Sequence, residues 1–481
     1  MERRATRAAL LGLLGLAGLG VLAVFLLRPS FPNYDSYYTL LWGRDLAAGR
    51  APDYDVFRTP TPHPLSTIVA ALMAPLGGAA DRALVLVSLL SWVALLALLF
   101  RMTQVLLGTL VGLVALGVLL TRTDLEFFAL RAVVDVPFLA LVFGAAVLEL
   151  ARPRRGVAVI ALLALAGLLR PEAWVLSGFY VLWASWGRGW GTFLRWSALA
   201  ALAPLGWALA DWAVTGQPLY SLTSTREVAG QFGRQRSVGE AVLLVPDYVG
   251  ANEKIVNVVA GGLGGLLALA LVRARAALPL ALVGVGMFVF LAIAAVGLSV
   301  IPRYLVIPSL VFNLCVACAL AGWTLARRGA LRRVAIALAL LTLALVAWRT
   351  PSYLKDARVL NSQTVFVRDQ HLGLSALLAE PAVARLLATC APLTVPTHSA
   401  IPVIRFETGM GKERIEASIQ QERPPERGLL LVGRTFNFEP TAARSTIGPS
   451  RSARKWWSNY PLSPFSYVAG NERWQLWKRC P

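Results

Sequence analysis

Charged residues are scarce in this chain of 481 residues. They make up 15% of the sequence, whereas hydrophobic residues make up 57% and the mean hydropathy is +0.62. In soluble globular proteins roughly a quarter of the residues are charged. The shortage of charge therefore excludes an ordinary soluble domain and indicates an integral membrane protein.

Cysteine is also scarce, with four residues in the whole chain. Cys315 and Cys318 have a zinc-like spacing, but no second Cys or His pair accompanies them, so we expect small buried apolar side chains and no zinc site. Cys390 and Cys480 bracket most of the C-terminal tail. If this tail lies on the oxidising side of the membrane, we expect the two to form a disulfide.

The net charge of +20 is spread unevenly between the apolar runs. If the N-terminus is cytosolic and the runs alternate, the cytosolic segments hold fifteen Arg and no Lys against two acids, Glu2 and Glu149. These segments supply +13 of the +20, as the positive-inside rule predicts. We therefore expect a cytoplasmic N-terminus, an extracytoplasmic tail and no nucleic-acid partner.

Eleven apolar runs are candidates to cross the membrane, which takes about 20 residues of helix. They are residues 8–27, 82–100, 104–120, 132–148, 157–169, 173–186, 196–212, 255–272, 277–300, 304–325 and 334–348. The first run has no Ala-x-Ala cleavage site, so we expect a retained anchor and not a removed signal. The sequence thus predicts an α-helical polytopic membrane protein with about eleven transmembrane helices in a domain of residues 1–348.

The first exterior segment, residues 28–81, has unusual content. Asp35 lies among tyrosines directly after the first apolar run, where a carboxylate is held at the depth of lipid head groups. Residues 37–46 predict a short amphipathic helix, and an apolar stretch ending at Leu76 predicts a helix that lies in the interface or re-enters it. This placement suggests chemistry on lipid-carried molecules.

The tail, residues 349–481, is only moderately hydrophobic. Short apolar runs such as 429–432 alternate with helical stretches such as 371–388, so we expect a small extracytoplasmic α/β domain. Its tryptophans are expected to pack in the core, with contact to glycan or membrane as the alternative. They are Trp456, Trp457, Trp474 and Trp477.

Several short motifs resemble the GT-C superfamily of polyprenyl-phosphate-dependent glycosyltransferases, which includes the protein O-mannosyltransferases and the aminoarabinose transferase of lipid A. They are an acid at Asp35, a turn at His63-Pro64-Leu65, Asp135-Val136-Pro137-Phe138-Leu139, Arg170-Pro171-Glu172 and Ile301-Pro302-Arg303-Tyr304. Residues 215–221 are similar to uncharacterised actinobacterial relatives. One departure is Asp35-Ser36, where the family often has an Asp-Glu pair.

The resemblance implies a glycosyltransferase of the bacterial cell envelope, a multi-pass protein of the plasma membrane. Such an enzyme moves one sugar, as the mannosyltransferases do, from a polyprenyl phosphate to an extracytoplasmic lipid, glycan or protein acceptor, with inversion expected. The alternative is a transporter or flippase of lipid-linked sugars. Transporters usually show paired halves with broken helices at the midplane, whereas the unusual polar content here lies at the exterior mouths.

Sugar transfer from a glycosyl phosphate needs a base for the acceptor proton and cations for the departing phosphate. The resemblance and the chemistry together point to Asp35 and Asp135 as catalytic residues. Arginine suits phosphate because its fork donates two parallel hydrogen bonds. The expected substrate-binding residues are His63, Arg131, Arg170, Glu172, Arg303 and Tyr304.

Each of these residues also has a simpler interpretation. Asp35 can cap a helix, His63 can be a turn residue, Arg170 can pair with Glu172, and Arg303 can anchor a span at the interface. No dedicated metal site is predicted. A divalent cation held by Asp35 with two acids of the next exterior loop stays open as a cofactor, with a polar loop as the alternative. These two acids are Asp124 and Glu126.

Overall fold

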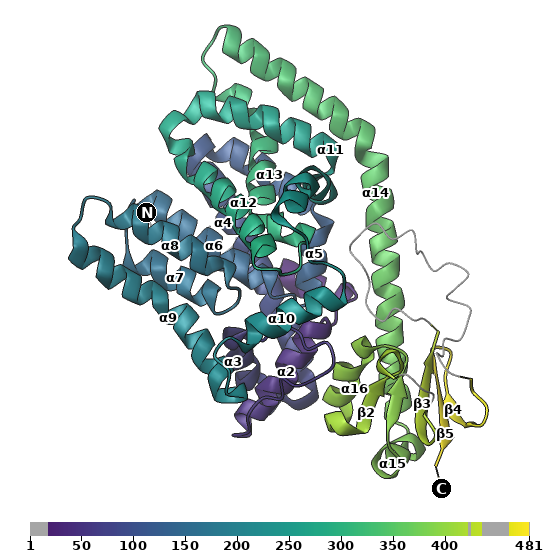
Figure 1. The fold of residues 1–481 in the computed structure, drawn as a ribbon. Helices are drawn as coiled ribbons and strands as arrows, with labels where there is room; N and C mark the ends of the chain where they lie inside the picture. Colours follow the sequence, from purple (N-terminus) through teal and green to yellow (C-terminus); the bar gives the residue numbers. More distant parts are fainter. Residues whose placement is uncertain (1–17, 422–424, 435–460, 481) are drawn as a thin grey trace, which may run out of the picture.

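The computed structural model describes residues 18–421, 425–434 and 461–480, and most of them are helical. Figure 1 shows a helical bundle joined by the long helix α14 to a small domain with a β-sheet. After a first helix at Gly18–Leu27, the helices are α2 Tyr34–Ala47, α3 Pro64–Met73, α4 Ala80–Leu120, α5 Thr123–Leu130, α6 Asp135–Ala151, α7 Val157–Gly167, α8 Glu172–Ser185, α9 Trp190–Thr215, α10 Tyr220–Gln231, α11 Val238–Val272, α12 Ala277–Ala295, α13 Val306–Ala321, α14 Ala330–Leu378, α15 Pro381–Thr389 and α16 Ile401–Thr408.

The eleven expected spans are not confirmed as a count. Among the described residues, six helices are long and apolar enough to cross a membrane, or seven if α5 and α6, which bend by 116°, form one broken span. The helices α7 and α8 have 11 and 14 residues, too few for a hydrocarbon core of about 30 Å. Of the first expected span, 8–27, only the helix Gly18–Leu27 is described.

Helix α4 contains two of the expected spans, 82–100 and 104–120. Its 41 residues are interrupted at Gly108, where φ is 84° and ψ is 168°. A Cβ atom on Gly112 would lie 3.3 Å from the carbonyl oxygen of Phe100. In a straight helix residues twelve positions apart are about 18 Å apart, so the chain folds back on itself and the two halves pack together.

Helix α13 lies in the middle of the bundle, with its apolar side chains almost all buried. It packs closely on α11, because a Cβ atom at Gly264 would fall 2.9 Å from the carbonyl carbon of Cys315. Cys318 is fully buried, and both cysteines are free thiols. Close helix contact at small residues is typical of membrane proteins, and these cysteines act here as small packing residues.

Helices α2 and α3 follow the first described helix and form a crossed pair. Asn33 caps α2, since its side-chain oxygen accepts a hydrogen bond from the Ser36 amide at 2.9 Å. At the crossing, a Cβ atom on Gly43 would lie 2.5 Å from that of Ala70, so only glycine fits at position 43. The amphipathic helix expected at 37–46 is α2, and the apolar stretch ending at Leu76 forms α3 and a 3-10 helix, Ala74–Ala79.

The C-terminal domain has the expected α/β composition. Its five strands are β1 Leu393–Val395, β2 Ile415–Ala417, β3 Gly428–Gly433, β4 Ser466–Gly470 and β5 Trp474–Arg479, in the order β2-β1-β3-β5-β4. Strand β1 pairs in parallel with β2 and β3, whereas β5 pairs antiparallel with β3 and β4. Trp474 is 1% exposed and belongs to the core, as expected, while Trp477 is partly buried against a second small cluster. Trp456 and Trp457 lie outside the described residues.

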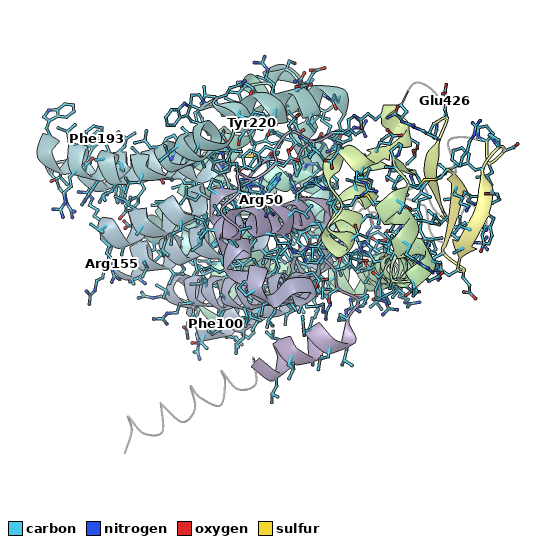
Figure 2. All side chains as sticks on the ribbon, turned by 90° about the horizontal axis from the view of Figure 1, so that it is seen from below. Arg50, Phe100, Arg155, Phe193, Tyr220 and Glu426 are labelled. Atoms are coloured by element: carbon cyan, nitrogen blue, oxygen red, sulfur yellow. A yellow bond between two sulfur atoms is a disulfide. The ribbon has the colours of Figure 1, made fainter. Side chains whose placement is uncertain are left out.

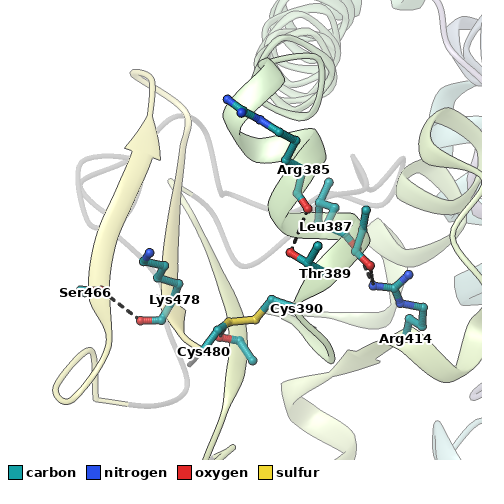
Figure 3. The surroundings of a disulfide bond; sticks show 10 residues. Arg385, Leu387, Thr389, Cys390, Arg414, Ser466, Lys478 and Cys480 are labelled. Atoms are coloured by element: carbon teal, nitrogen blue, oxygen red, sulfur yellow. Dashed lines mark hydrogen bonds between the residues drawn. A yellow bond between two sulfur atoms is a disulfide. The ribbon is translucent and has the colours of Figure 1, made fainter.

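A disulfide joins Cys390 to Cys480, as the sequence analysis predicts (Figure 3). It connects the end of α15 to the last described residue after β5, with the two Cα atoms 6.2 Å apart. A cross-link that closes a loop of this length restricts the unfolded chain strongly. The bridge therefore ties the end of the inner strand β5 to the end of α15.

The C-terminal domain also contacts residues 28–81 directly. Lys412 Nζ donates to Asp53 Oδ1 at 2.8 Å, and Arg44 Nη1 donates to the carbonyl oxygen of Phe406 at 2.6 Å. Helix α14 contains Pro351 and continues through positions 348 and 349, so the expected boundary between residues 1–348 and 349–481 lies within one helix.

In Figure 2, Phe193 of the bundle and Glu426 of the domain lie at opposite ends of the molecule.

Candidate functional site

Asp135, Arg170 and Glu172 form a charged cluster at the N-terminal ends of α6 and α8. Asp135 is the first residue of α6, and Glu172 is the first residue of α8. Arg170 bonds to one oxygen of Asp135, and its Nη2 atom lies 2.5 Å from Glu172 Oε1. Asp135 and Arg170 are only 2% and 6% exposed. The pairing of Arg170 with Glu172 that the sequence allows is therefore present, and Asp135 extends it into a triad.

Arg303 and Tyr304 approach this triad from a 3-10 helix, Pro302–Leu305, which leads directly into α13. Arg303 Nη1 lies 3.9 Å from the second oxygen of Asp135. The Nε atom of Arg303 is buried and has no hydrogen-bond partner among the described residues. Tyr304 lies beneath Arg170, with 5.0 Å from the guanidinium to the ring centroid. The Arg170 guanidinium is thus paired with two carboxylates, whereas the Arg303 guanidinium can still donate a hydrogen bond.

These side chains line a small cavity of about 20 Å³. Its walls are Asp135, Phe138, Leu139, Arg170, Glu172, Leu176, Gly286, Val289, Arg303, Tyr304, Val306 and Ile307. This volume holds roughly one water molecule. A larger ligand must therefore bind at the mouth of the cavity or widen it.

Asp35 lies in the first turn of α2, and the charges of Arg303, Asp135 and Arg234 act on it. Its neighbour Asn33 is the helix cap, so Asp35 is not needed for that role. Burial raises the pKa of Asp35 above its ordinary value; the Arg303 guanidinium opposes the rise and the Asp135 carboxylate adds to it. Asp35 is thus more basic than an ordinary surface carboxylate.

His63 precedes α3 and belongs to the same region. Burial, together with the positive charges of Arg170 and Arg303, lowers its pKa to about 3. The ring is therefore neutral at physiological pH. It packs edge-on against Trp207, with ring centroids 5.9 Å apart, and its Nδ1 atom has no hydrogen-bond partner within the described part of the chain.

Arg131 lies apart from this group. Its side chain is 1% exposed and lies 4.0 Å over the ring of Phe31, and it is not one of the residues that line the cavity. Its carbonyl oxygen accepts a hydrogen bond from the Asn33 amide at 2.9 Å. Arg131 thus lies beside the cap of α2 and not at the cavity. The other expected site residues are brought together by the structure: Asp35, His63, Asp135, Arg170, Glu172, Arg303 and Tyr304.

Arg234 is a candidate that the sequence analysis missed. It lies in the connection between α10 and α11, its side chain is exposed, and its charge acts on both Asp35 and Arg303. Its carbonyl oxygen accepts from the Val300 amide at 2.9 Å, next to the segment that carries Arg303. No motif marks Arg234 in the sequence; in the structure it follows Gly233, whose φ of 60° forms a turn.

The acids proposed as cation ligands do not gather around Asp35. Asp124 accepts two hydrogen bonds from Arg122, at 2.8 and 2.6 Å, and Glu126 pairs with Arg28 at 2.9 Å. Within the described residues, no group of three or more His, Cys, Asp or Glu side chains could hold a metal ion. Asp124 and Glu126 are instead paired with Arg122 and Arg28.

Comparison with known proteins identifies the fold. No family model matches the chain, and no curated protein matches it. The crystal structure of ArnT from Cupriavidus metallidurans bound to undecaprenyl phosphate is similar over 97% of this chain and 98% of that chain, with a TM-score of 0.51 and 13% identity. The apo structure of the same ArnT aligns with a TM-score of 0.48 and 13% identity. The chain therefore has an ArnT-like fold.

Proposed function

We propose that this protein is a glycosyltransferase of the bacterial plasma membrane that takes a sugar from a polyprenyl phosphate and transfers it to an extracytoplasmic acceptor. The observation that carries the proposal is that the N-terminal ends of three helices meet at one cluster of charged side chains. Asp135 and Glu172 each begin a helix, and Arg303 lies in the turn that begins α13. Helix N-termini carry partial positive charge and favour anions.

The charges of the cavity suit a phosphate leaving group. Arg170 is already paired with two carboxylates, whereas Arg303 has a buried Nε donor without a partner among the described residues and only a 3.9 Å contact to Asp135. A phosphate oxygen is the acceptor that such a fork binds best. Arg303 is therefore our candidate for the donor phosphate, with Arg234 as a second cation from the exposed side.

Asp35 is our candidate for the general base. In the proposed reaction it takes the proton of an acceptor hydroxyl while that oxygen forms a bond to the anomeric carbon of the sugar. The bond between this carbon and the phosphate oxygen breaks, and polyprenyl phosphate leaves with both electrons and its charge held by arginine. The raised pKa of Asp35 favours proton abstraction, whereas Asp135 is fixed in an ion pair and suits a role in orienting the two arginines.

The similarity to ArnT, which was solved with undecaprenyl phosphate, supports a lipid-phosphate donor. A transporter or flippase of lipid-linked sugars would need polar groups near the middle of its helices. The candidate site instead draws its charges from helix starts, and no observation favours the transport alternative. We further propose that residues 1–348 form the catalytic domain and that residues 349–481 lie outside the cytoplasm and help to hold the acceptor.

The direct test is transfer in a reconstituted system. Purified protein in lipid nanodiscs is mixed with a sugar linked to undecaprenyl phosphate and with an extracted cell-envelope acceptor fraction, and the released undecaprenyl phosphate and glycosylated product are measured. The proposal predicts both products in equal amounts, formed roughly 10²-fold to 10⁴-fold more slowly by the Asp35→Asn variant. Movement of intact donor across the bilayer, without release of the lipid phosphate, would support the transport alternative.

A further inference from the structure

Helix α11 is broken at a residue that is not glycine. Lys254 has φ 61° and ψ 149°, and it divides the helix into an N-terminal part and the expected membrane span 255–272. A left-handed φ is unfavourable at a residue with a side chain and persists only where the surroundings fix it. The contacts on both sides of Lys254 therefore reveal what the break accomplishes.

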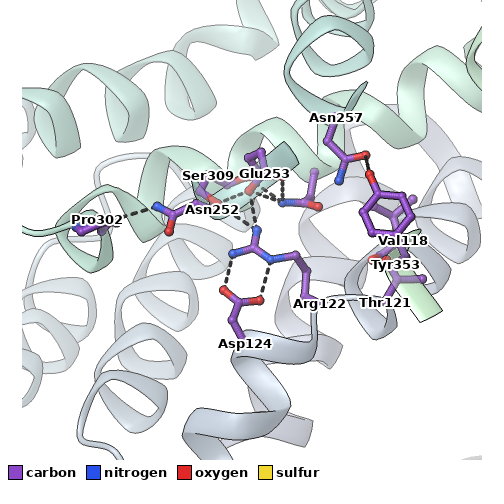
Figure 4. Close-up of polar contacts among 11 residues, drawn as sticks. Val118, Thr121, Arg122, Asp124, Asn252, Glu253, Asn257, Pro302, Ser309 and Tyr353 are labelled. Carbon is purple, nitrogen blue, oxygen red and sulfur yellow. Dashed lines mark hydrogen bonds and ion pairs between the residues drawn. The ribbon is translucent and has the colours of Figure 1, made fainter. Parts of the chain in front are cut away.

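The residue before the break, Glu253, is fully buried in a polar network (Figure 4). Its carboxylate accepts from Arg122, which precedes α5, and from Ser309 of α13. Asn313, one turn further along α13, donates to both carboxylate oxygens at 2.8 and 2.9 Å. A buried carboxylate with this many donors is fixed in position, so the break in α11 is locked to the start of α13.

The residue after Glu253 contacts the opposite side. Lys254 Nζ lies 2.5 Å from Asp356 Oδ2, and Tyr353 donates to Asn257 Oδ1 at 3.4 Å. Both partners belong to α14. The Lys254 side of the break therefore faces α14, whereas Asn252, on the Glu253 side, contacts the segment that carries Arg303.

Side chains of α11 donate hydrogen bonds to the backbone of the segment that carries Arg303. Asn252 Nδ2 donates to the carbonyl oxygen of Pro302 at 2.9 Å, one residue before Arg303 (Figure 4). Tyr248, one turn earlier in α11, donates to the carbonyl oxygen of Val300 at 3.0 Å. These two bonds, both from α11, set the path of the chain directly before Arg303.

We propose that Asn252 is a positioning residue for Arg303. Glu253 fixes the break in α11, and this holds the side-chain amide of Asn252 against the Pro302 carbonyl oxygen. The hydrogen bond in turn fixes the direction of the Arg303 guanidinium. This inference rests on the proposed function, in which Arg303 binds the donor phosphate. A misplacement of about 1 Å at a binding group is enough to cost a large factor in activity.

The test uses two variants of the full-length protein. Asn252→Asp keeps the size of the side chain and removes its hydrogen-bond donor. Asn252→Ala removes the donor and shortens the side chain. Loss of one hydrogen bond predicts a roughly fivefold to tenfold weaker affinity for undecaprenyl phosphate, with turnover at saturating donor much less affected. Asn257→Ala is the matched control, because Asn257 lies beyond the break and contacts α14.

A double-mutant cycle separates positioning from general destabilisation. If Asn252 acts through Arg303, then Asn252→Ala causes no further loss of donor affinity in the Arg303→Ala background. Hydrogen exchange at the amides of residues 301 and 303–305 should rise in Asn252→Ala and stay unchanged in Asn257→Ala. An additive loss in the cycle, or unchanged affinity and exchange, would overturn the inference. Wild-type protein that binds no undecaprenyl phosphate would overturn the proposed function instead, while exchange still reports whether Asn252 holds the segment.

Discussion

Arg303 reaches Asp135 only at 3.9 Å, from its Nη1 atom to the Oδ2 atom of the carboxylate. The other oxygen of Asp135 is bonded to Arg170, which also holds Glu172. One carboxylate therefore faces two arginines but satisfies only one of them closely. This asymmetry leaves Arg303 attracted to the site and still able to bind a second anion.

Asp35→Asn is predicted to lower turnover by roughly 10²-fold to 10⁴-fold, the usual range for a general base. Asparagine keeps the size of the side chain and removes its basicity, and the cap at Asn33 stays intact. Turnover is measured with a lipid-linked sugar donor, and donor affinity is the control that should change little. Turnover at the wild-type rate would move the role of base to Asp135 or Glu172.

The pH dependence of the reaction follows from the same residue. The carboxylate form of Asp35 is the active form, so the rate falls as pH drops through its pKa in the folded protein. Because burial raises this pKa, the fall in rate at acidic pH should be centred above pH about 4, the ordinary pKa of Asp. The profile of kcat/KM against pH measures the limb. An acid limb that persists unchanged in the residual activity of Asp35→Asn would assign it to another group.

Arg303→Lys is predicted to weaken binding of polyprenyl phosphate, although it keeps the positive charge. Lysine offers a point charge in place of the planar fork, so the paired hydrogen bonds to phosphate are lost. Arg303→Ala should weaken binding more strongly than Arg303→Lys. Binding of undecaprenyl phosphate to the purified variants measures both effects, and full affinity in Arg303→Ala would make this residue a membrane anchor.

Removal of the disulfide is predicted to destabilise the C-terminal domain. Cys390→Ala with Cys480→Ala should lower the free energy of unfolding of this domain by about 2–5 kcal/mol. Thermal unfolding of the purified protein, followed with and without reductant, measures the change. Mass spectrometry that finds both thiols free in protein prepared without reductant would contradict the bridge.

The orientation of the chain is a separate prediction from the arginines of the expected cytosolic segments. A protease added to intact spheroplasts should remove a tag placed after Pro481, while a tag placed before Met1 is protected. Cleavage of the C-terminal tag only after the membrane is broken would reverse the topology. Such a result would also remove the expectation of an oxidising compartment for Cys390 and Cys480.

Local patterns in the sequence predict much of the fold. The helix at 37–46, the α/β tail and the Cys390–Cys480 pair follow from periodicity, composition and spacing, and all three are present. The number of spans does not follow, because apolar runs alone cannot separate α7 and α8 from helices long enough to cross the membrane. The fold-back within α4 likewise depends on the contact between Gly112 and Phe100.

The candidate site is harder to predict because it depends on long-range pairing. Motifs drew attention to Asp35, Asp135 and Arg303, but no local pattern shows that Arg170 bonds to Asp135. Arg131 fits the same pattern of an arginine at the end of a span, yet it packs on Phe31. Arg234 has no motif at all, and only the three-dimensional fold brings it near Asp35.

The distance along the chain between members of the charged group has a consequence for biosynthesis. Arg170 is made 35 residues after Asp135, so this ion pair can form soon after its hairpin enters the membrane. Arg303 follows Asp135 by 168 residues, which takes roughly 8 to 34 s at ordinary translation rates. We expect Arg170 alone to neutralise the buried carboxylate from the synthesis of Arg170 until that of Arg303, 133 residues later. We therefore expect the Asp135–Arg170 pair to form in the nascent protein before the rest of the site is assembled.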